Sequence, residues 1–179
     1  MEDKDYRETK LSSKSIYKGH IIDVYVDDII LPNGSKATRE LVRHCKASAV
    51  LAFDSDDNVI LEKQFRYPYD EVITEIPAGK ADKDEDPLIT AKRELLEETG
   101  YDANEITLLG EFYPSVAYTD EIIYLYEAHG LVRKKQHLDD DETLSYFKVS
   151  LDEFKQMIKN GQIKDGKTIA ALGYYLLKH

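Results

Sequence analysis

Residues 79–101, near the middle of the chain, predict one helix with a crowded acidic face that is unfavourable unless a group outside the helix compensates for it. Asp86 followed by Pro87 is typical of a helix N-cap and first helical residue, and Gly100 is typical of the left-handed residue that ends a helix. The helix is therefore predicted over 87–99. At 100° per residue, one apolar stripe would face a core, and it comprises Leu88, Ala91 and Leu95.

Acidic residues crowd an adjacent, accessible face of the same helix. Glu94 and Glu98 are four positions apart, so their Cβ atoms lie about 6 Å from each other, and like charges at that spacing cost a few tenths of a kcal/mol. Glu97 and Glu98 also fall in the last turn, where the helix dipole disfavours anions. A bound divalent cation would relieve both effects, whereas a simple pair of glutamates would be solvated surface.

The spacing of polar and glycine residues around this helix resembles the signature of the Nudix hydrolases. The matching positions are Gly79, Glu85, Arg93, Glu94, Glu97, Glu98 and Gly100, with Tyr101 in the final apolar position. Within the pattern, Glu85 is either a solvated loop residue or a structural one.

The resemblance implies an enzyme that hydrolyses a nucleoside diphosphate linked to another group, with Mg²⁺ or Mn²⁺ as cofactor. Mg²⁺ prefers oxygen ligands and bridges a few carboxylates to substrate phosphates. By the resemblance, Glu94 and Glu98 are metal ligands, Glu97 is a further one, and the backbone carbonyl of Ala78 joins them. Arg93 would orient the glutamates through a salt bridge. The resemblance also implies that Glu97 and Arg93 are catalytic residues.

Segments outside the signature resemble the ADP-ribose pyrophosphatase branch of the family. That branch has an N-terminal β extension that pairs two subunits, matched here by 20–44. It also has an EQxR-like segment and an SPG-type loop ending in an acidic residue, matched by 63–66 and 113–121. The resemblance implies a homodimer.

The same resemblance implies three substrate contacts. Arg39 and Arg66 would contact the diphosphate or terminal ribose, and Glu121 would accept hydrogen bonds from ribose hydroxyls. Arginines on strands are also common solvated or cross-strand partners, and Glu121 could be an ordinary loop acid. Val116 and Ala117 replace the Pro-Gly of the branch, which keeps another nucleoside diphosphate sugar open as substrate.

The catalytic base of this branch is a glutamate on a loop beyond the signature. The matching acidic run is 139–142, and Glu142 directly precedes a predicted strand, so we expect Glu142 to deprotonate or orient the water. A solvated acidic loop is the alternative.

Alternating and apolar segments predict the remaining elements. Residues 20–31 and 36–44 flank the turn 32–35 and predict a hairpin, and 47–53 with 59–65 predict a second one. Further strands are predicted at 72–76, 106–113, 122–128 and 143–149, a polar loop at 131–142, and helices from a Ser150 cap to about 159 and over 168–178. These elements indicate an α/β fold. The resemblance implies a Nudix-type α/β/α sandwich with a mixed sheet (46–179) behind an N-terminal antiparallel β extension (1–45).

Composition restricts the partners. The 179 residues carry a net charge of -11, which argues against a nucleic-acid or anionic membrane surface. The resemblance implies a small-molecule partner, a nucleoside diphosphate sugar. The single cysteine, Cys45, is expected to be buried, and no apolar run is long enough to span a bilayer, so we expect a cytoplasmic protein. The leading hypothesis is Mg²⁺-dependent hydrolysis of ADP-ribose to AMP and ribose 5-phosphate. The alternatives are another nucleoside diphosphate sugar or a non-catalytic Nudix domain that senses ADP-ribose.

Overall fold

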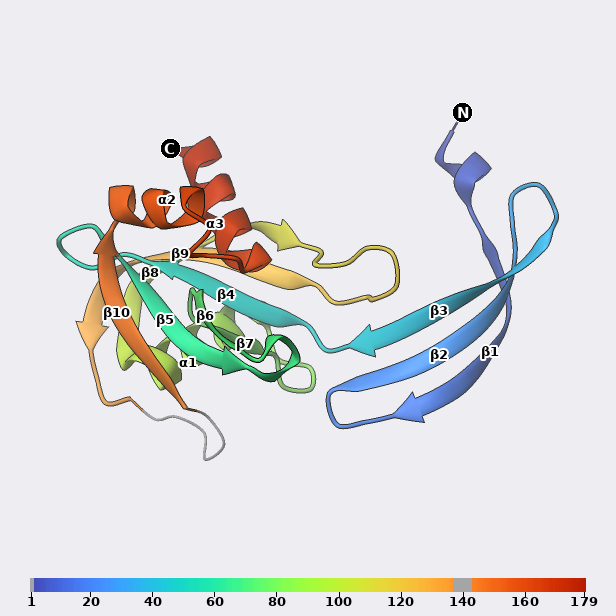
Figure 1. Cartoon of the computed structure of the whole chain (residues 1–179), viewed down its shortest axis with the longest axis horizontal. Coiled ribbons are helices and arrows are strands. Elements are labelled where there is room, and N and C mark those ends of the chain that lie inside the picture. The colour runs from blue at the N-terminus through green and yellow to red at the C-terminus, as the bar shows by residue number, and fades with distance from the viewer. Residues whose placement is uncertain (1, 137–142) are drawn as a thin grey trace. The chain divides into compact units, whose positions relative to one another are not determined.

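The computed structural model of the chain describes residues 2–136 and 143–179 (Figure 1). Its contacts form two compact units, one of Met1–Cys45 with Ser115–Glu121 and the other of Lys46–Pro114 with Ile122–His179. Among the described residues, no helix combines the length and apolar character needed to cross a membrane.

The first unit is an antiparallel sheet in the order β1-β2-β3, preceded by the 3-10 helix η1 (Asp3–Tyr6). Its strands are β1 (Thr9–Lys18), β2 (Ile22–Ile30) and β3 (Lys36–His44). The β2–β3 hairpin matches the predicted one, and Gly34 in its turn has φ +83°, which glycine adopts at little cost. The segment Ser115–Glu121 joins this sheet, because the Val42 N–H donates to the Tyr118 carbonyl at 2.7 Å.

The second unit contains a mixed sheet and a smaller antiparallel sheet. The mixed sheet has the order β7-β4-β9-β8, with β4 parallel to β9, and the antiparallel sheet has the order β10-β5-β6. The strands are β4 (Ala47–Ala52), β5 (Asn58–Arg66), β6 (Glu71–Glu75), β7 (Ala78–Lys80), β8 (Tyr101–Phe112), β9 (Ile123–Arg133) and β10 (Leu144–Ser150).

Helices cover the sheets of the second unit on two sides. Helix α1 (Pro87–Thr99) packs on one side, and α2 (Leu151–Lys159) and α3 (Gly166–Lys178) pack on the other (Figure 1). A short 3-10 helix, η2 (Tyr67–Tyr69), links β5 to β6. Every residue of β4 is buried because successive side chains enter opposite layers: Leu51 joins the α2/α3 core and Val50 joins the α1 core. The predicted α/β sandwich with a mixed sheet is confirmed.

Several predicted boundaries were wrong. β4 and β5 do not form an extended hairpin: the two strands share one bridge, between Phe53 and Val59, and then enter different sheets. The loop predicted from residue 131 instead begins after Arg133, because the end of β9 pairs with the start of β8 directly after α1. Cys45 is exposed rather than buried, since it lies in the connection between β3 and β4.

Candidate active site

Helix α1 begins and ends where the sequence predicts. The Asp86 side chain accepts a hydrogen bond from the Leu88 N–H at 2.8 Å, and Pro87 supplies the first helical residue. Gly100 adopts φ +70° and its N–H bonds to the Leu96 carbonyl. These caps fix the helix register and hence the direction of its acidic face.

Strand β7 lies against that acidic face. A Cβ atom added to Gly79 would meet the Glu94 carboxyl carbon at 2.0 Å, so the glycine leaves the space that this carboxylate occupies. One residue earlier, the Ala78 N–H donates to Glu98 Oε2 at 2.9 Å. Two of the predicted metal ligands therefore lie against the backbone that carries the third, the Ala78 carbonyl.

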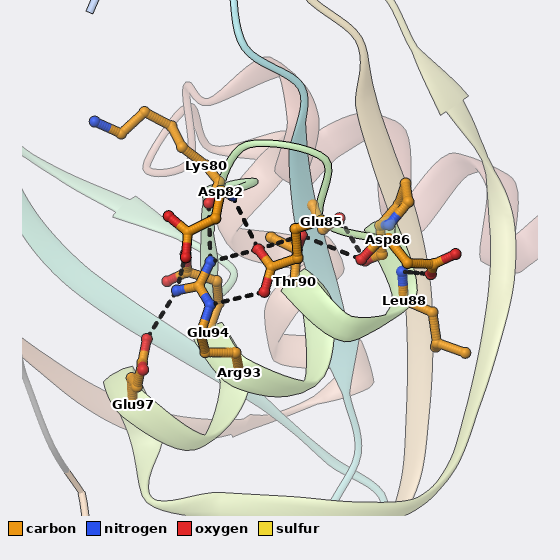
Figure 2. Close-up of polar contacts among 11 residues, drawn as sticks. Lys80, Asp82, Glu85, Asp86, Leu88, Thr90, Arg93, Glu94 and Glu97 are labelled. Atoms are coloured by element: carbon orange, nitrogen blue, oxygen red, sulfur yellow. Dashed lines mark hydrogen bonds and ion pairs between the residues drawn. The ribbon is translucent and has the colours of Figure 1, made fainter. Parts of the chain in front are cut away.

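Arg93 links the helix to the preceding loop through five hydrogen bonds (Figure 2). Its Nη1 donates to Glu94 Oε1 at 2.8 Å and to Glu97 Oε2 at 2.9 Å. Its Nη2 reaches the Lys80 carbonyl at 2.9 Å and Glu85 Oε2 at 3.0 Å. The Glu85 hydrogen bond is the main reason that the pKa of Arg93 is raised. Arg93 thus stays charged and holds two of the acids in place.

Glu85 is a structural residue of this site rather than a solvated one. Besides Arg93, it accepts hydrogen bonds from the Asp82 N–H at 3.0 Å and from Thr90 Oγ1 at 2.9 Å. The hydrogen bond from Arg93 lowers the pKa of Glu85 to about 2, against the opposing effect of burial. The carboxylate fastens the loop to the first turns of α1.

The acids of the helix differ in exposure. Glu94 and Glu98 are only 7 % and 1 % exposed, whereas the Glu97 side chain is 31 % exposed. The accessible face predicted for Glu98 is therefore wrong, because β7 and the strands beneath the helix cover it. Buried carboxylates need compensation by cations or hydrogen bonds.

The donor set fits a hard divalent cation. Glu94, Glu98 and the Ala78 carbonyl supply oxygen atoms, and Mg²⁺ takes one or two carboxylates together with water and substrate oxygens. Within residues 2–136 and 143–179, no three His, Cys, Asp or Glu side chains converge as a ready-made cage. A site formed by two of these carboxylates and the Ala78 carbonyl is consistent with both facts, and any further carboxylate would have to move toward the cation to bind it.

A second polar cluster surrounds the end of β5. Arg66 forks onto Glu75 with hydrogen bonds of 2.6 and 2.7 Å, and Lys167 of α3 also donates to Glu75. Burial raises the pKa of Glu75, but its bonds with Arg66 and Lys167 outweigh this and lower it. The predicted substrate residue Arg66 therefore has a protein carboxylate as its partner.

Sequence reasoning missed Glu62, which lies fully buried on β5. Burial, followed by repulsion from Glu75, raises the pKa of Glu62 well above its usual range. Lys167 of α3 was missed with it. The available signal was alternation: Glu62 stands two residues after Ile60, which packs in the α1 core, so it belongs to the face of β5 toward α1.

The predicted substrate residues of the first unit have partners within that unit. Arg39 forms an ion pair with Glu8, with Nε donating to Oε2 at 3.0 Å. Glu121 lies with its Oε1 3.5 Å from Nδ1 of His44. Glu142, the predicted base, lies outside the described residues.

Comparison with known proteins places this site in a family. Residues 43–172 match the NUDIX domain, and residues 8–42 match the nucleoside diphosphate sugar hydrolase N-terminal domain. The chain belongs to the Nudix family. The predicted membership is confirmed, and with it the Nudix pyrophosphohydrolase class.

Two relatives match almost the whole Nudix chain. An ADP-ribose pyrophosphatase of Bacillus subtilis (strain 168) is 41 % identical over 98 % of this chain and 96 % of its own length. A methanol dehydrogenase activator of Bacillus methanolicus is 42 % identical over 97 % and 95 %. The crystal structure of an ADP compounds hydrolase has a TM-score of 0.86 at 21 % identity, covering 94 % of this chain and 92 % of that one, which supports the fold.

Proposed function

We propose that this Nudix enzyme hydrolyses the diphosphate bond of ADP-ribose to AMP and ribose 5-phosphate with Mg²⁺ as cofactor, Mn²⁺ being a possible substitute. The observation that carries the proposal is the position of Glu94 and Glu98 against β7, where Glu98 accepts from the Ala78 N–H and the Glu94 carboxylate lies against Gly79. The relative from Bacillus subtilis, an ADP-ribose pyrophosphatase, supports the choice of substrate.

The residues that would hold the cation are Glu94, Glu98, Glu97 and the Ala78 carbonyl. A bound Mg²⁺ supplies neutralisation of phosphate charge and a lowered pKa for the attacking water. Arg93 keeps Glu94 and Glu97 fixed through its two hydrogen bonds from Nη1, so that these carboxylates need little rearrangement on binding. We assign Glu142 as the base that deprotonates or orients the water.

Selectivity is assigned to Arg39, Arg66 and Glu121. Arg66 suits a diphosphate because the fork that holds Glu75 is the geometry that also binds phosphate oxygens. Glu75 fixes the orientation of that guanidinium. Glu121 has the acceptor oxygens that ribose hydroxyls require.

The test is phosphate release in a phosphatase-coupled assay with ADP-ribose and Mg²⁺, because the products AMP and ribose 5-phosphate expose phosphomonoesters that the substrate lacks. ADP-glucose, GDP-mannose and NADH serve as competing substrates, and EDTA as the metal-free control. Glu98→Gln should lower kcat by orders of magnitude with the fold retained. Faster turnover of a competing substrate would reject ADP-ribose.

Another nucleoside diphosphate sugar is the nearest alternative substrate. The departure at Val116 and Ala117 favours it. The N-terminal domain that residues 8–42 match is named for the whole class of nucleoside diphosphate sugars, to which ADP-ribose also belongs. A non-catalytic sensing domain is disfavoured because the acids of α1 and their Arg93 support are complete.

A second candidate function is activation of a dehydrogenase. It is favoured by the methanol dehydrogenase activator that matches 97 % of this chain. The test is the rate of methanol oxidation by a methanol dehydrogenase with and without the protein. A rate increase that the Glu98→Gln variant cannot produce would link activation to hydrolysis.

We also infer a cytoplasmic homodimer formed through residues 20–44. Removal of that segment should give a monomer with poor substrate affinity. Sedimentation showing an intact dimer after removal would reject this role of the segment.

A further inference from the structure

Glu62 is a buried carboxyl that the fold alone does not explain. It is 0 % exposed, and among the buried side-chain polar atoms of the described residues its two carboxylate oxygens are the ones without a hydrogen-bond partner. A buried polar group without a hydrogen-bond partner destabilises the folded state, and a charged one does so more strongly. A residue that costs stability in this way calls for a role outside folding.

The position of Glu62 directs it toward the glutamate face of α1. Along β5, Leu61 packs in the core beneath α2 and α3, whereas Ile60 packs with Leu95 of α1. Because side chains alternate along a strand, Glu62 lies on the Ile60 face. Burial and repulsion from Glu75 raise the pKa of Glu62, whereas a side-chain interaction with Glu98 lowers it, so the two carboxyls lie close together. Neither Glu62 oxygen makes a hydrogen bond of standard geometry.

The basic residues near Glu62 bond to another carboxylate, that of Glu75. Arg66 and Lys167 both hydrogen-bond to Glu75, which is the cross-strand partner of Glu62 on β6. These cations reduce the charge around Glu62 but do not bond to it. Glu62 is therefore a carboxyl beside Glu98 in the protein interior that receives no hydrogen bond from Arg66 or Lys167.

We propose that Glu62 is a further ligand for the divalent cation held by Glu98 and the Ala78 carbonyl. This inference rests on the proposed metal-dependent function and adds to it a ligand from outside the signature helix. The chemistry is suitable because a carboxylate oxygen is the donor that Mg²⁺ and Mn²⁺ prefer. A cation would also remove the cost of the orphaned oxygens.

The experiment compares Mn²⁺ binding to the wild type, Glu62→Gln and a matched control, Glu127→Gln, by electron paramagnetic resonance of free Mn²⁺. Glu127 is also a buried strand glutamate, at 8 % exposed, but it bonds to His179 and stands on β9 in the alternation that faces α3. We expect Glu62→Gln to bind Mn²⁺ about 10–100-fold more weakly, the range seen when support of a metal site is removed, and Glu127→Gln to match the wild type.

Thermal unfolding distinguishes a metal ligand from a residue with only a structural role, because the two predict different Tm values with and without metal. Without metal, Glu62→Gln should be at least as stable as the wild type, because it loses only an uncompensated carboxyl. The increase in Tm on adding Mn²⁺ should then be smaller in the variant than in the wild type. Unchanged Mn²⁺ affinity would overturn the proposal, and so would a metal-free variant that is destabilised or fails to fold.

The two proposals fail in different ways. If the wild type binds no Mn²⁺ and hydrolyses no substrate, the proposed function is rejected. If the wild type does both and Glu62→Gln binds Mn²⁺ equally well, only the role of Glu62 is rejected.

Discussion

Replacing Glu85 by glutamine tests whether the loop before α1 is fastened by charge. Glutamine keeps the size of the side chain and can still accept from Asp82 and Thr90, but it loses the charge and places an amide donor against Arg93. The pKa of Glu85 is lowered from an ordinary value near 4.5 to about 2. At 1.36 kcal/mol per pKa unit this corresponds to an upper limit of about 3 kcal/mol, and with solvent screening at a 13 % exposed side chain we expect about 2 kcal/mol.

The stabilisation by Glu85 has a defined pH window. Because the pKa of Glu85 is lower in the folded than in the unfolded protein, its contribution is fully present above about pH 4.5 and is lost as the pH falls through about 2. At pH 7, Glu85→Gln should lower Tm by about 4–8 °C, measured by circular dichroism. The difference should shrink as the pH falls from 5 to 3.

The matched control is Glu105→Gln, which removes the same charge from an exposed strand position and should leave Tm within about 1 °C at every pH. An unchanged Tm for Glu85→Gln at pH 7 would refute the reasoning. A Tm difference that stays constant on acidification would refute the assignment to charge.

Three other substitutions test neighbouring features. Gly79→Ala should fold, because the atoms it meets are the end of the Glu94 side chain, but the displaced carboxylate should lower kcat/KM at least 10-fold in the ADP-ribose assay. Asp54→Asn should lower the free energy of unfolding by about 2 kcal/mol at pH 7, measured by urea unfolding. Burial raises the pKa of Asp54, but hydrogen bonds from Lys148 and from backbone N–H groups outweigh this and lower the pKa from 3.8 to about 2. The difference between variant and wild type should therefore fade as the pH falls from about 4 to 2. Asp86→Ala removes the α1 N-cap and should lower Tm by roughly 2–4 °C, the effect of about 1 kcal/mol.

Local signals explain what could be predicted from the sequence. The bounds of α1 followed from Asp86 and Gly100 because a cap and a left-handed glycine act within one turn of the residues that they fix. The β2–β3 hairpin followed from its turn for the same reason. The signature residues were found because their spacing along one helix decides which of them share a face.

Long-range pairing explains what could not be predicted. β4 and β5 read as a hairpin because a short turn joins them, yet β4 pairs instead with β9, about 75 residues later. The same uncertainty hid the surroundings of Glu98, whose burial depends on strands that the helix sequence does not specify. Glu62 escaped notice because it stands where an apolar run, 59–61, meets a polar one that begins at Lys63, and the groups that surround it come from other elements.

The two clusters around α1 and β5 differ in how their negative charge is balanced. Arg93 serves Glu85, Glu94 and Glu97 together, and this support leaves their positions fixed without a ligand. Glu62 is fully buried, and the cations near it, Arg66 and Lys167, bond to Glu75 instead. Preorganised carboxylates need only a small rearrangement to bind a cation, whereas uncompensated ones gain the most free energy from it. If the proposed cation binds beside the Ala78 backbone, α1 should therefore keep its position on binding, and the metal-induced rise in Tm should come mainly from Glu62.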